Sequence, residues 1–426
     1  MTEPLYRSRP GGFQIRAASM PAAREIREGI YVSEGLSNTF LVTTPDGRIV
    51  INTGMGFEAP IHKRNYDAVD TTALRYILLT QGHVDHVGGV DLFREPGTEI
   101  VAQAGNAAHQ ADDARIAPFR AARSWFAFAG VIAEALERAH AAGGAAAQAK
   151  PEPTITFEDR HAFELGGQRF ELIATPGGET LDSMVIWLPD RKICFAGNLF
   201  SALFGHIPNL VTIRGDRYRD ALRFVESLDT VMALEPELLL VGHHDPVEGT
   251  ALIHSELARL RAATLYVHDR TVEGMNAHTD LYTLMQEIQL PPELEVGEGY
   301  GKVSWDVRAI WETYAGWFHH LSTTELYPDS PADIHADLVE LAGGADAIAA
   351  RARIRLTAGH AVQAIRLTEI ARSVDPGHHE ALAVSLGAHE QLDRESDNFW
   401  LSSWLRNQAA ELRKLLGLAP QGTGGA

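Results

Sequence analysis

The stretch "TQGHVDHVGG" at residues 80–89 places His83, Asp85 and His86 within four consecutive positions. Imidazole nitrogens and a carboxylate oxygen are ligands that suit zinc, iron or manganese. The stretch directly follows the apolar run "LRYILL", which is typical of a buried strand. The glycines of the stretch allow a sharp turn into the next helix. We therefore predict a metal-derived site at the end of this strand, rather than a polar turn with solvated histidines.

A second histidine-bearing loop has the same placement. The segment "LLLVGHHDPVEG" at 238–249 is an apolar run followed by His243 and His244. Ligands of layered folds gather on the loops at strand ends. The two loops are therefore expected to meet at one shared metal site.

The elements that must position these loops alternate in type. We predict helices at 58–69 and 218–234, a helix that starts within 87–93, and a mostly helical segment at 105–142. The predicted strands are 29–35, 38–47, 48–52, 74–80, 98–102, 154–157, 168–175, 183–189 and 192–197. Two runs of strands, each followed by helices, predict an α/β fold with two packed sheets and helices outside.

From residue 251 the strand signals end and amphipathic helical stretches follow. Residues 358–389 resemble a helical hairpin of tetratricopeptide type, and an ordinary helical bundle is the alternative. The predicted domains are therefore 1–250, 251–417 as an all-α region, and a disordered tail at 418–426.

The charge balance limits the partners. The 426 residues carry a formal net charge of −19, and no basic stripe offsets it. This excludes a general binder of nucleic acid or of anionic membranes. The N-terminus does not resemble a signal peptide, and no apolar run reaches membrane-spanning length. We expect a cytoplasmic protein with a small-molecule substrate.

The loop at 80–89 resembles the signature of the metallo-β-lactamase superfamily, Thr-His-x-His-x-Asp-His-x-Gly-Gly, at every position except the first His, which is Gln81. The resemblance implies a metallo-β-lactamase αββα sandwich. It also implies a ligand after a Pro-Gly turn, here Glu179, and one in a late Gly-His loop. That second ligand is His243, with His244 as the alternative.

The chain is most similar to the linear alkyl sulfatases within that superfamily, whose Glu after the Pro-Gly turn matches Glu179. The motif "NLVTIRG" at 209–215 implies that Asn209 and Arg214 face a sulfate group. A structural salt bridge is the alternative role for Arg214. The segment 299–318 resembles the helical dimerisation domain of these enzymes, which implies a homodimer.

Several residues depart from this pattern. Gln81 replaces a metal-binding His, Gly197 and Asn198 stand where a bridging acid is usual, and Trp305 replaces a His near the reaction centre. Asp85 and Asn198 remain candidate catalytic residues. Asn198 could bridge two metal ions only weakly. Trp305 either shapes a pocket for an apolar substrate or makes core and dimer contacts.

The resemblance divides the ligands into two sets. Site one contains Gln81, His83 and Glu179, and site two contains Asp85, His86 and His243. A neutral amide oxygen is a weaker ligand than imidazole, so we expect site two to bind more tightly. The expected cofactor is a divalent metal, one or two ions per chain. Zinc is the first choice, and iron or manganese are alternatives.

The sequence therefore predicts a metal-dependent hydrolase resembling linear alkyl sulfatases. Metal-activated water would attack an ester with an anionic or polar head and an apolar tail. Two alternatives stay open. One is different chemistry on the same scaffold, either hydrolysis of another ester or lactone or iron-dependent oxidation. The other is a non-enzymatic dimeric binding protein with a degenerate metal site.

Overall fold

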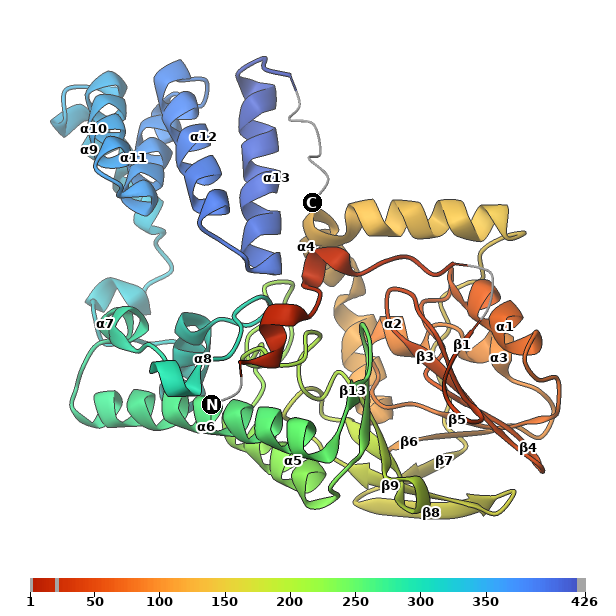
Figure 1. Ribbon diagram of the computed structural model, residues 1–426. Helices are drawn as coiled ribbons and strands as arrows, with labels where there is room; N and C mark the ends of the chain where they lie inside the picture. The colour runs from red at the N-terminus through yellow and green to blue at the C-terminus, as the bar shows by residue number, and fades with distance from the viewer. Residues whose placement is uncertain (1–2, 20–22, 420–426) are drawn as a thin grey trace. The chain divides into compact units, whose positions relative to one another are not determined.

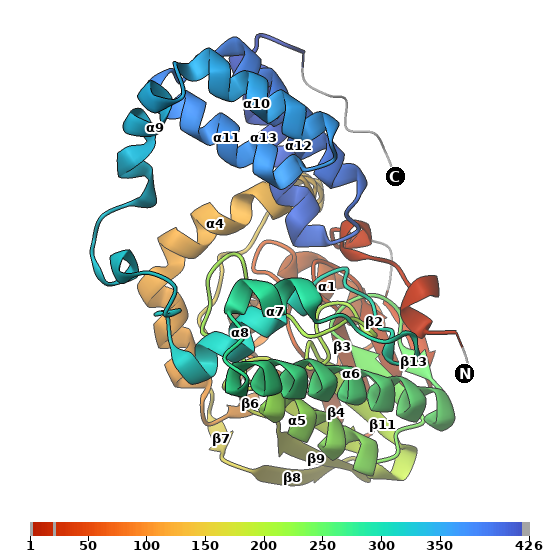
Figure 2. The same cartoon turned by 90° about the vertical axis from the view of Figure 1, so that its left-hand side faces the viewer.

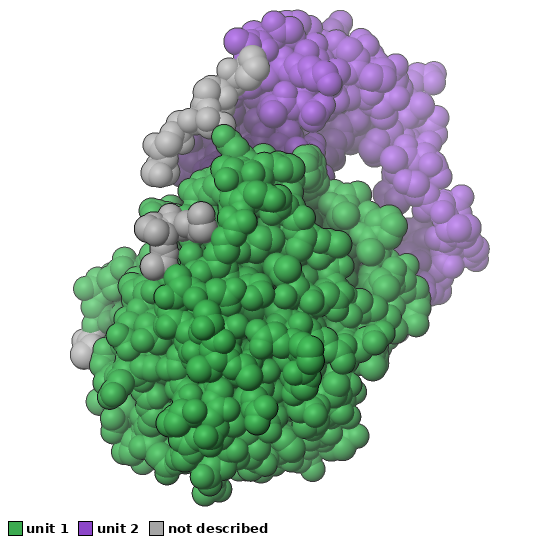
Figure 3. Space-filling model, turned by 90° about the vertical axis from the view of Figure 1, so that its right-hand side faces the viewer, with its two compact units in different colours: residues 1–316 green, residues 317–426 purple. Residues whose placement is uncertain are grey.

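The computed structural model describes residues 3–19 and 23–419. Its chain forms two compact units, residues 1–316 and 317–426 (Figures 1 and 3). Both predicted metal-site loops belong to the first unit.

The first unit contains two sheets of mixed direction. The first sheet has the order β1-β2-β3-β4-β5-β6-β7. Its strands are β1 (Arg24–Arg27), β2 (Ile30–Ser33), β3 (Thr39–Thr44), β4 (Gly47–Ile51), β5 (Leu74–Leu78), β6 (Glu99–Gln103) and β7 (Ile155–Phe157). The second sheet has the order β13-β12-β11-β10-β9-β8. Its strands are β8 (Arg160–Leu165), β9 (Gln168–Ala174), β10 (Met184–Leu188), β11 (Ile193–Gly197), β12 (Leu238–Val241) and β13 (Val247–Glu248).

The two sheets pack face to face because their strands carry apolar side chains on both faces. In β4, Ile49 and Ile51 enter the core between the sheets, and Val50 points to the outer helices. In β11, Phe195 faces the core between the sheets, and Cys194 faces the opposite side. Successive side chains of a strand point to opposite faces, so strands apolar at every position must be covered on both sides.

Helices cover both outer faces, which completes the predicted αββα sandwich (Figures 1 and 2). The helices that lie between strands in the chain are α1 (Ala59–Asp67), α2 (Val84–Val87), α3 (Val90–Phe93), α4 (Asn106–Ala141) and α5 (Ala221–Ala233). The long helix α4 contains Pro118 and is kinked at Ile116, whose φ of −120° is not helical. Proline removes a helical hydrogen bond and clashes with the preceding turn.

Three further helices complete the first unit: α6 (Thr250–Asn276), α7 (Leu281–Glu287) and α8 (Val303–Ala315). Helix α6 packs Ile253, Leu257 and Leu260 into the core on the outer face of the second sheet. The boundary between compact units therefore lies at 316/317. The sequence placed a domain boundary at 250/251, where the strand signals end. A functional division at that point stays a prediction.

The second unit is helical. It contains α9 (His335–Leu341), α10 (Ala345–Thr357), α11 (Ala361–Val374), α12 (His379–Arg394) and α13 (Phe399–Leu415). Alanines fill the cores between consecutive helices, among them Ala349, Ala352 and Ala388. Small side chains let helix axes approach closely. Most of the predicted disordered tail lies outside the described residues.

The remaining helical turns are short 3₁₀ segments: Leu5–Ser8, Gly12–Gln14, Pro189–Arg191, Pro292–Leu294, Thr323–Leu326 and Pro331–Ile334. Across the described ranges, none of the helices combines the length and the apolar character needed to cross a bilayer.

Candidate metal centre

The loop after β5 brings the predicted ligands to the edge of the sandwich. His83 is extended, with φ −61° and ψ 143°, and α2 begins at the next residue. Gly89 then lies against the backbone of Thr53 and the side chain of Ala59, so a Cβ atom there would come within 2.5 Å of both. Only glycine permits this close approach. The glycines of the motif therefore fix the loop against the first sheet.

Three predicted ligands converge in the structure. Asp85, His86 and His243 offer ligand atoms that all lie within 4.8 Å of one another. The Asp85 carboxylate lies 3.6 Å from Nε2 of His86 and 3.9 Å from Nε2 of His243. Both histidines are buried. This set is the predicted site two, assembled from two loops about 160 residues apart in sequence.

The protonation states of this cluster suit metal binding. Burial lowers the pKa of His86, and burial lowers the pKa of His243 to about 4. Burial opposes ionisation of Asp85, yet the neighbouring His86 and His243 outweigh it and lower the pKa of that carboxyl. Neutral imidazoles and an ionised carboxylate are the forms that coordinate a metal.

Buried polar atoms in this cluster lack other partners. Both ring nitrogens of His86 and Nδ1 of His243 make no hydrogen bond within the described residues. Buried polar atoms are normally paired, and a bound ion would be a partner for Nε2 of His86, which lies 3.6 Å from the Asp85 carboxylate. The donor set therefore fits one divalent metal.

His243 is better placed than its neighbour. His243 belongs to the converging group, and His244 does not. The backbone of His244 has φ 61°, and its carbonyl accepts a hydrogen bond from Nδ2 of Asn38 at 2.8 Å. The tight turn thus directs the two adjacent side chains differently, which favours His243 as the ligand.

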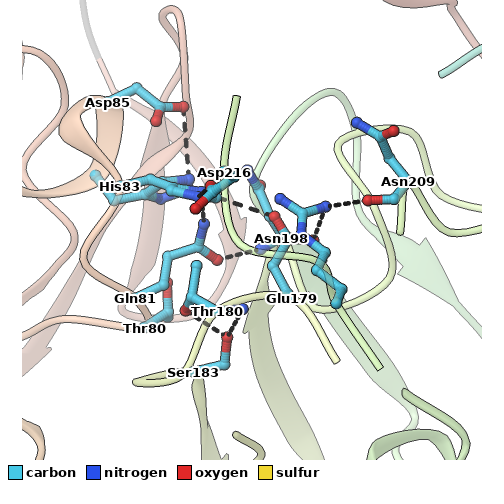
Figure 4. A network of polar contacts seen from close by, with 12 residues as sticks. Thr80, Gln81, His83, Asp85, Glu179, Thr180, Ser183, Asn198, Asn209 and Asp216 are labelled. Atoms are coloured by element: carbon cyan, nitrogen blue, oxygen red, sulfur yellow. Dashed lines mark hydrogen bonds and ion pairs between the residues drawn. The ribbon is translucent and has the colours of Figure 1, made fainter. Parts of the chain in front are cut away.

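The predicted site-one residues are engaged within the protein (Figure 4). Oε1 of Gln81 accepts a hydrogen bond of 3.1 Å from the backbone N–H of Asn198. Nε2 of the same amide lies 2.6 Å from Nδ1 of His83. Burial lowers the pKa of His83 to about 3, so its ring is neutral and has one acceptor nitrogen.

Glu179 has an arginine partner. Nη1 of Arg219 lies 2.7 Å from Oε2 of Glu179, and both side chains are only 6% exposed. The other carboxylate oxygen lies 3.7 Å from Nδ1 of His83. Burial raises the pKa of Glu179 to about 7, and Arg219 and Arg214 act against this rise.

A charged group not found from the sequence borders His83 on its other side. Oδ2 of Asp216 lies 3.8 Å from Nε2 of His83, and Oδ1 accepts a 2.9 Å contact from Arg120 of α4. Burial opposes ionisation of Asp216, but His83, Arg219 and Arg120 outweigh it and hold its pKa far below the usual range. Asp216 and Arg219 both lie in the run "RGDRYRD" at 214–220, which begins with Arg214. This dense run of charged residues is the sequence signal that could have identified them.

The predicted anion-binding residues lie beside this cluster. Nη2 of Arg214 is 3.3 Å from Nε2 of His83 and 3.9 Å from Asp216. The carbonyl of Asn209 accepts a bond from Arg219 at 2.9 Å, and its amide Nδ2 is buried without a partner in the described part of the chain. Nε of Arg214 is also buried and unpaired there. Two donors are thus available to an anion.

Asn198 and Trp305, the remaining two predicted site residues, have surroundings that differ from each other. Asn198, just after β11, uses its backbone to hold Gln81, and its Oδ1 is buried without a partner among the described residues. Trp305 lies in the first turn of α8, and its backbone N–H donates to Lys302 at 2.9 Å. No hydrogen bond of the described residues joins Trp305 to the cluster, so its role stays a prediction.

A cavity of about 450 Å³ borders His243. The segment from Pro10 to Ser19 forms one wall, and Asn38 and Arg138 also line it. A cavity of this size is within the range of small-molecule sites.

Comparisons with known proteins agree with this fold. The metallo-beta-lactamase superfamily matches residues 32–267, which is more than half of the chain. The chain therefore belongs to the metallo-beta-lactamase superfamily, as predicted. The alkyl sulfatase dimerisation family matches residues 282–415.

Individual relatives are alkylsulfatases by name. A linear primary-alkylsulfatase of Pseudomonas sp. is 27% identical over 392 residues, covering 87% of this chain and 73% of the relative. An alkyl/aryl-sulfatase of Saccharomyces cerevisiae is 25% identical over 428 residues, covering 92% of this chain and 64% of the relative. The chain thus spans about two thirds to three quarters of their length.

A solved structure shares the fold. A stereoselective inverting sec-alkylsulfatase from Pseudomonas sp. superposes with a TM-score of 0.81 at 22% identity, covering 95% of this chain and 67% of that one. The predicted architecture, a metallo-β-lactamase sandwich followed by a helical region, is confirmed. The prediction of an enzyme on this scaffold agrees with the named relatives.

Proposed function

We propose that this protein is a metal-dependent hydrolase of sulfate esters with an apolar alkyl tail. The observation that supports it most is the position of Arg214 beside His83, at the edge of the Asp85, His86 and His243 cluster. A guanidinium group presents a planar set of donors that suits a sulfate. The alkylsulfatase names of the relatives point to the same substrate class.

Asp85, His86 and His243 would hold the metal, and zinc is the ion we propose because two imidazoles and a carboxylate form a common zinc set. A divalent ion bound there supplies Lewis acidity that activates water and polarises an ester oxygen. The remaining roles belong to the chain itself.

Arg214 and the unpaired amide of Asn209 would bind the sulfate oxygens and orient the scissile bond. Charge-assisted hydrogen bonds to an anion are stronger than neutral ones, above all where water is scarce. Dimer formation through the helical region also belongs to this proposal.

The test measures release of inorganic sulfate from octyl sulfate by the purified protein. We expect Arg214→Ala to lower kcat/KM by on the order of 30-fold or more, since a desolvated charge contact is worth roughly 2–5 kcal/mol. Bound metal should stay unchanged. Arg217→Ala is the matched control, because Arg217 is exposed and pairs with Asp112 at 2.6 Å on the surface.

Two results would count against the proposal. One is hydrolysis of octyl esters of carboxylic acids with none of octyl sulfate, which would favour the alternative chemistry on this scaffold. The other is an Arg214→Ala variant that matches Arg217→Ala on every substrate cleaved.

A further inference from the structure

The buried Arg219–Glu179 pair lies where the superfamily pattern would place a second metal. Arg219 is held from several sides. Its backbone N–H donates to the carbonyl of Leu210 at 2.9 Å, and its Nη1 donates to the carbonyl of Asn209 at the same distance. The guanidinium is thus fixed against Glu179 by the backbone of the 209–210 segment.

The orientation of Gln81 is also fixed. A backbone N–H can only donate a hydrogen bond, so the atom of Gln81 that faces the N–H of Asn198 must be the amide oxygen. The amide nitrogen then faces Nδ1 of His83. Gln81 therefore offers His83 a hydrogen-bond donor rather than a second ligand atom beside the ring.

A second guanidinium completes the arrangement. Nη2 of Arg214 lies 3.3 Å from Nε2 of His83. Because Nδ1 accepts from Gln81, Nε2 carries the proton of the neutral ring, and this contact brings a positive charge close without a hydrogen bond. Each of the three predicted site-one residues is thus already engaged by a protein group. Two positive charges, Arg214 and Arg219, also stand within contact distance of this set. These two charges already balance the carboxylates of Glu179 and Asp216, so the set offers a second dication no net negative charge.

The neighbouring cluster of Asp85, His86 and His243 differs from site one in how its polar atoms are paired. His86 and His243 keep buried nitrogens without partners in the described residues, whereas Glu179 has an arginine at 2.7 Å. We propose that the protein binds one metal ion, at Asp85, His86 and His243, and that the Arg219 guanidinium replaces the second cation by neutralising Glu179. This inference concerns the number of ions and is independent of the ester that is cleaved.

The decisive variant is Glu179→Gln, tested on the full chain by native mass spectrometry and zinc titration. A glutamine can still accept the hydrogen bond from Arg219, but it is a poor metal ligand. We expect wild type and Glu179→Gln to bind one zinc ion each, with dissociation constants that agree within about threefold. Asp85→Asn should weaken zinc binding by on the order of 100-fold, because it removes an ionised ligand.

Glu226→Gln is the matched control, since Glu226 forms an exposed pair with Arg223 at 2.8 Å. It should leave zinc binding unchanged and show no change in melting temperature. Glu179→Gln should lower the melting temperature, because it removes the charge of a buried ion pair.

Cobalt(II) gives a second readout that needs no variant. The visible absorption of the wild-type protein should stop rising at one equivalent of cobalt. Two tightly bound ions in the wild type, or the loss of an ion in folded Glu179→Gln, would overturn the proposal. Loss of sulfatase activity alone would bear on the proposed function and not on this ion count.

Discussion

At the scale of single residues, the backbone of Gly197 explains why an acid is absent at that position. Gly197 ends β11 with φ +54°, and a Cβ atom there would lie 2.8 Å from Cβ of Thr80. Asn52 fixes Thr80 through hydrogen bonds of 3.0 Å in both directions. The local structure has therefore adapted to a residue without a side chain.

Restoring the bridging acid should consequently fail. We expect Gly197→Glu to lower the free energy of unfolding by more than about 2 kcal/mol, since left-handed backbone costs 1–2 kcal/mol for other residues and the clash adds to it. Zinc content should not rise above that of the wild type. Urea unfolding and metal analysis together check both statements.

Gly167→Glu is the control for the backbone cost alone. Gly167 also has a positive φ, +76°, but a Cβ atom there meets nothing within 4 Å. If Gly197→Glu were no less stable than Gly167→Glu, or if it bound a second zinc ion, the steric explanation would be wrong.

At the scale of elements, the start of α5 positions Arg219. Asp220 is the N-cap of α5, and its carboxylate accepts hydrogen bonds from the backbone N–H groups of Leu222 at 2.8 Å and Arg223 at 3.0 Å. Arg219 immediately precedes this cap. A helix that packs Phe224 and Leu228 into the core thereby delivers a guanidinium to the metal centre.

Removal of the cap should destabilise this part of the molecule. We expect Asp220→Ala to lower the free energy of unfolding by about 1 kcal/mol, the usual cost of losing an N-cap side chain. Asp220→Asn keeps an acceptor oxygen and should lose much less. Urea denaturation of both variants is the measurement, and equal losses in the two would show that the cap is not the cause.

At the scale of the whole molecule, the second unit exposes large apolar side chains along 317–341. Trp317 is 67% exposed and Leu341 is 83% exposed, and Tyr327 and Ile334 are more than half exposed. Residues 282–415 match the alkyl sulfatase dimerisation family. Large apolar side chains exposed to this extent, in a segment that matches a dimerisation family, are candidates for an association surface.

We therefore expect a homodimer with twice the chain mass of 46.5 kDa in light scattering. Leu341→Glu should raise the dimer dissociation constant by at least about tenfold, because a charge is costly inside an apolar interface. Leu136→Glu, at a partly exposed leucine of α4, should leave the dimer intact. A wild-type monomer at micromolar concentration would contradict this prediction.

The sequence alone predicted two packed sheets with helices outside, because the apolar runs that form the strands and the periodicity that forms the helices are local patterns. The sequence also predicted that the two histidine-bearing loops meet at one site, since both follow apolar strands. The ligand set of Asp85, His86 and His243 was implied by the superfamily resemblance, and the preference for His243 over His244 came from the structure. The place of α6 in the first unit was decided only by tertiary packing against the second sheet. The hydrogen-bond and ion-pair partners of the site-one residues were likewise decided only by the tertiary structure. Its partners approach from distant segments: the N–H of Asn198 orients Gln81, and Arg219 reaches Glu179 across 40 residues. Hydrogen-bond direction and charge pairing depend on the spatial arrangement of such groups, and residue spacing along the chain does not encode it.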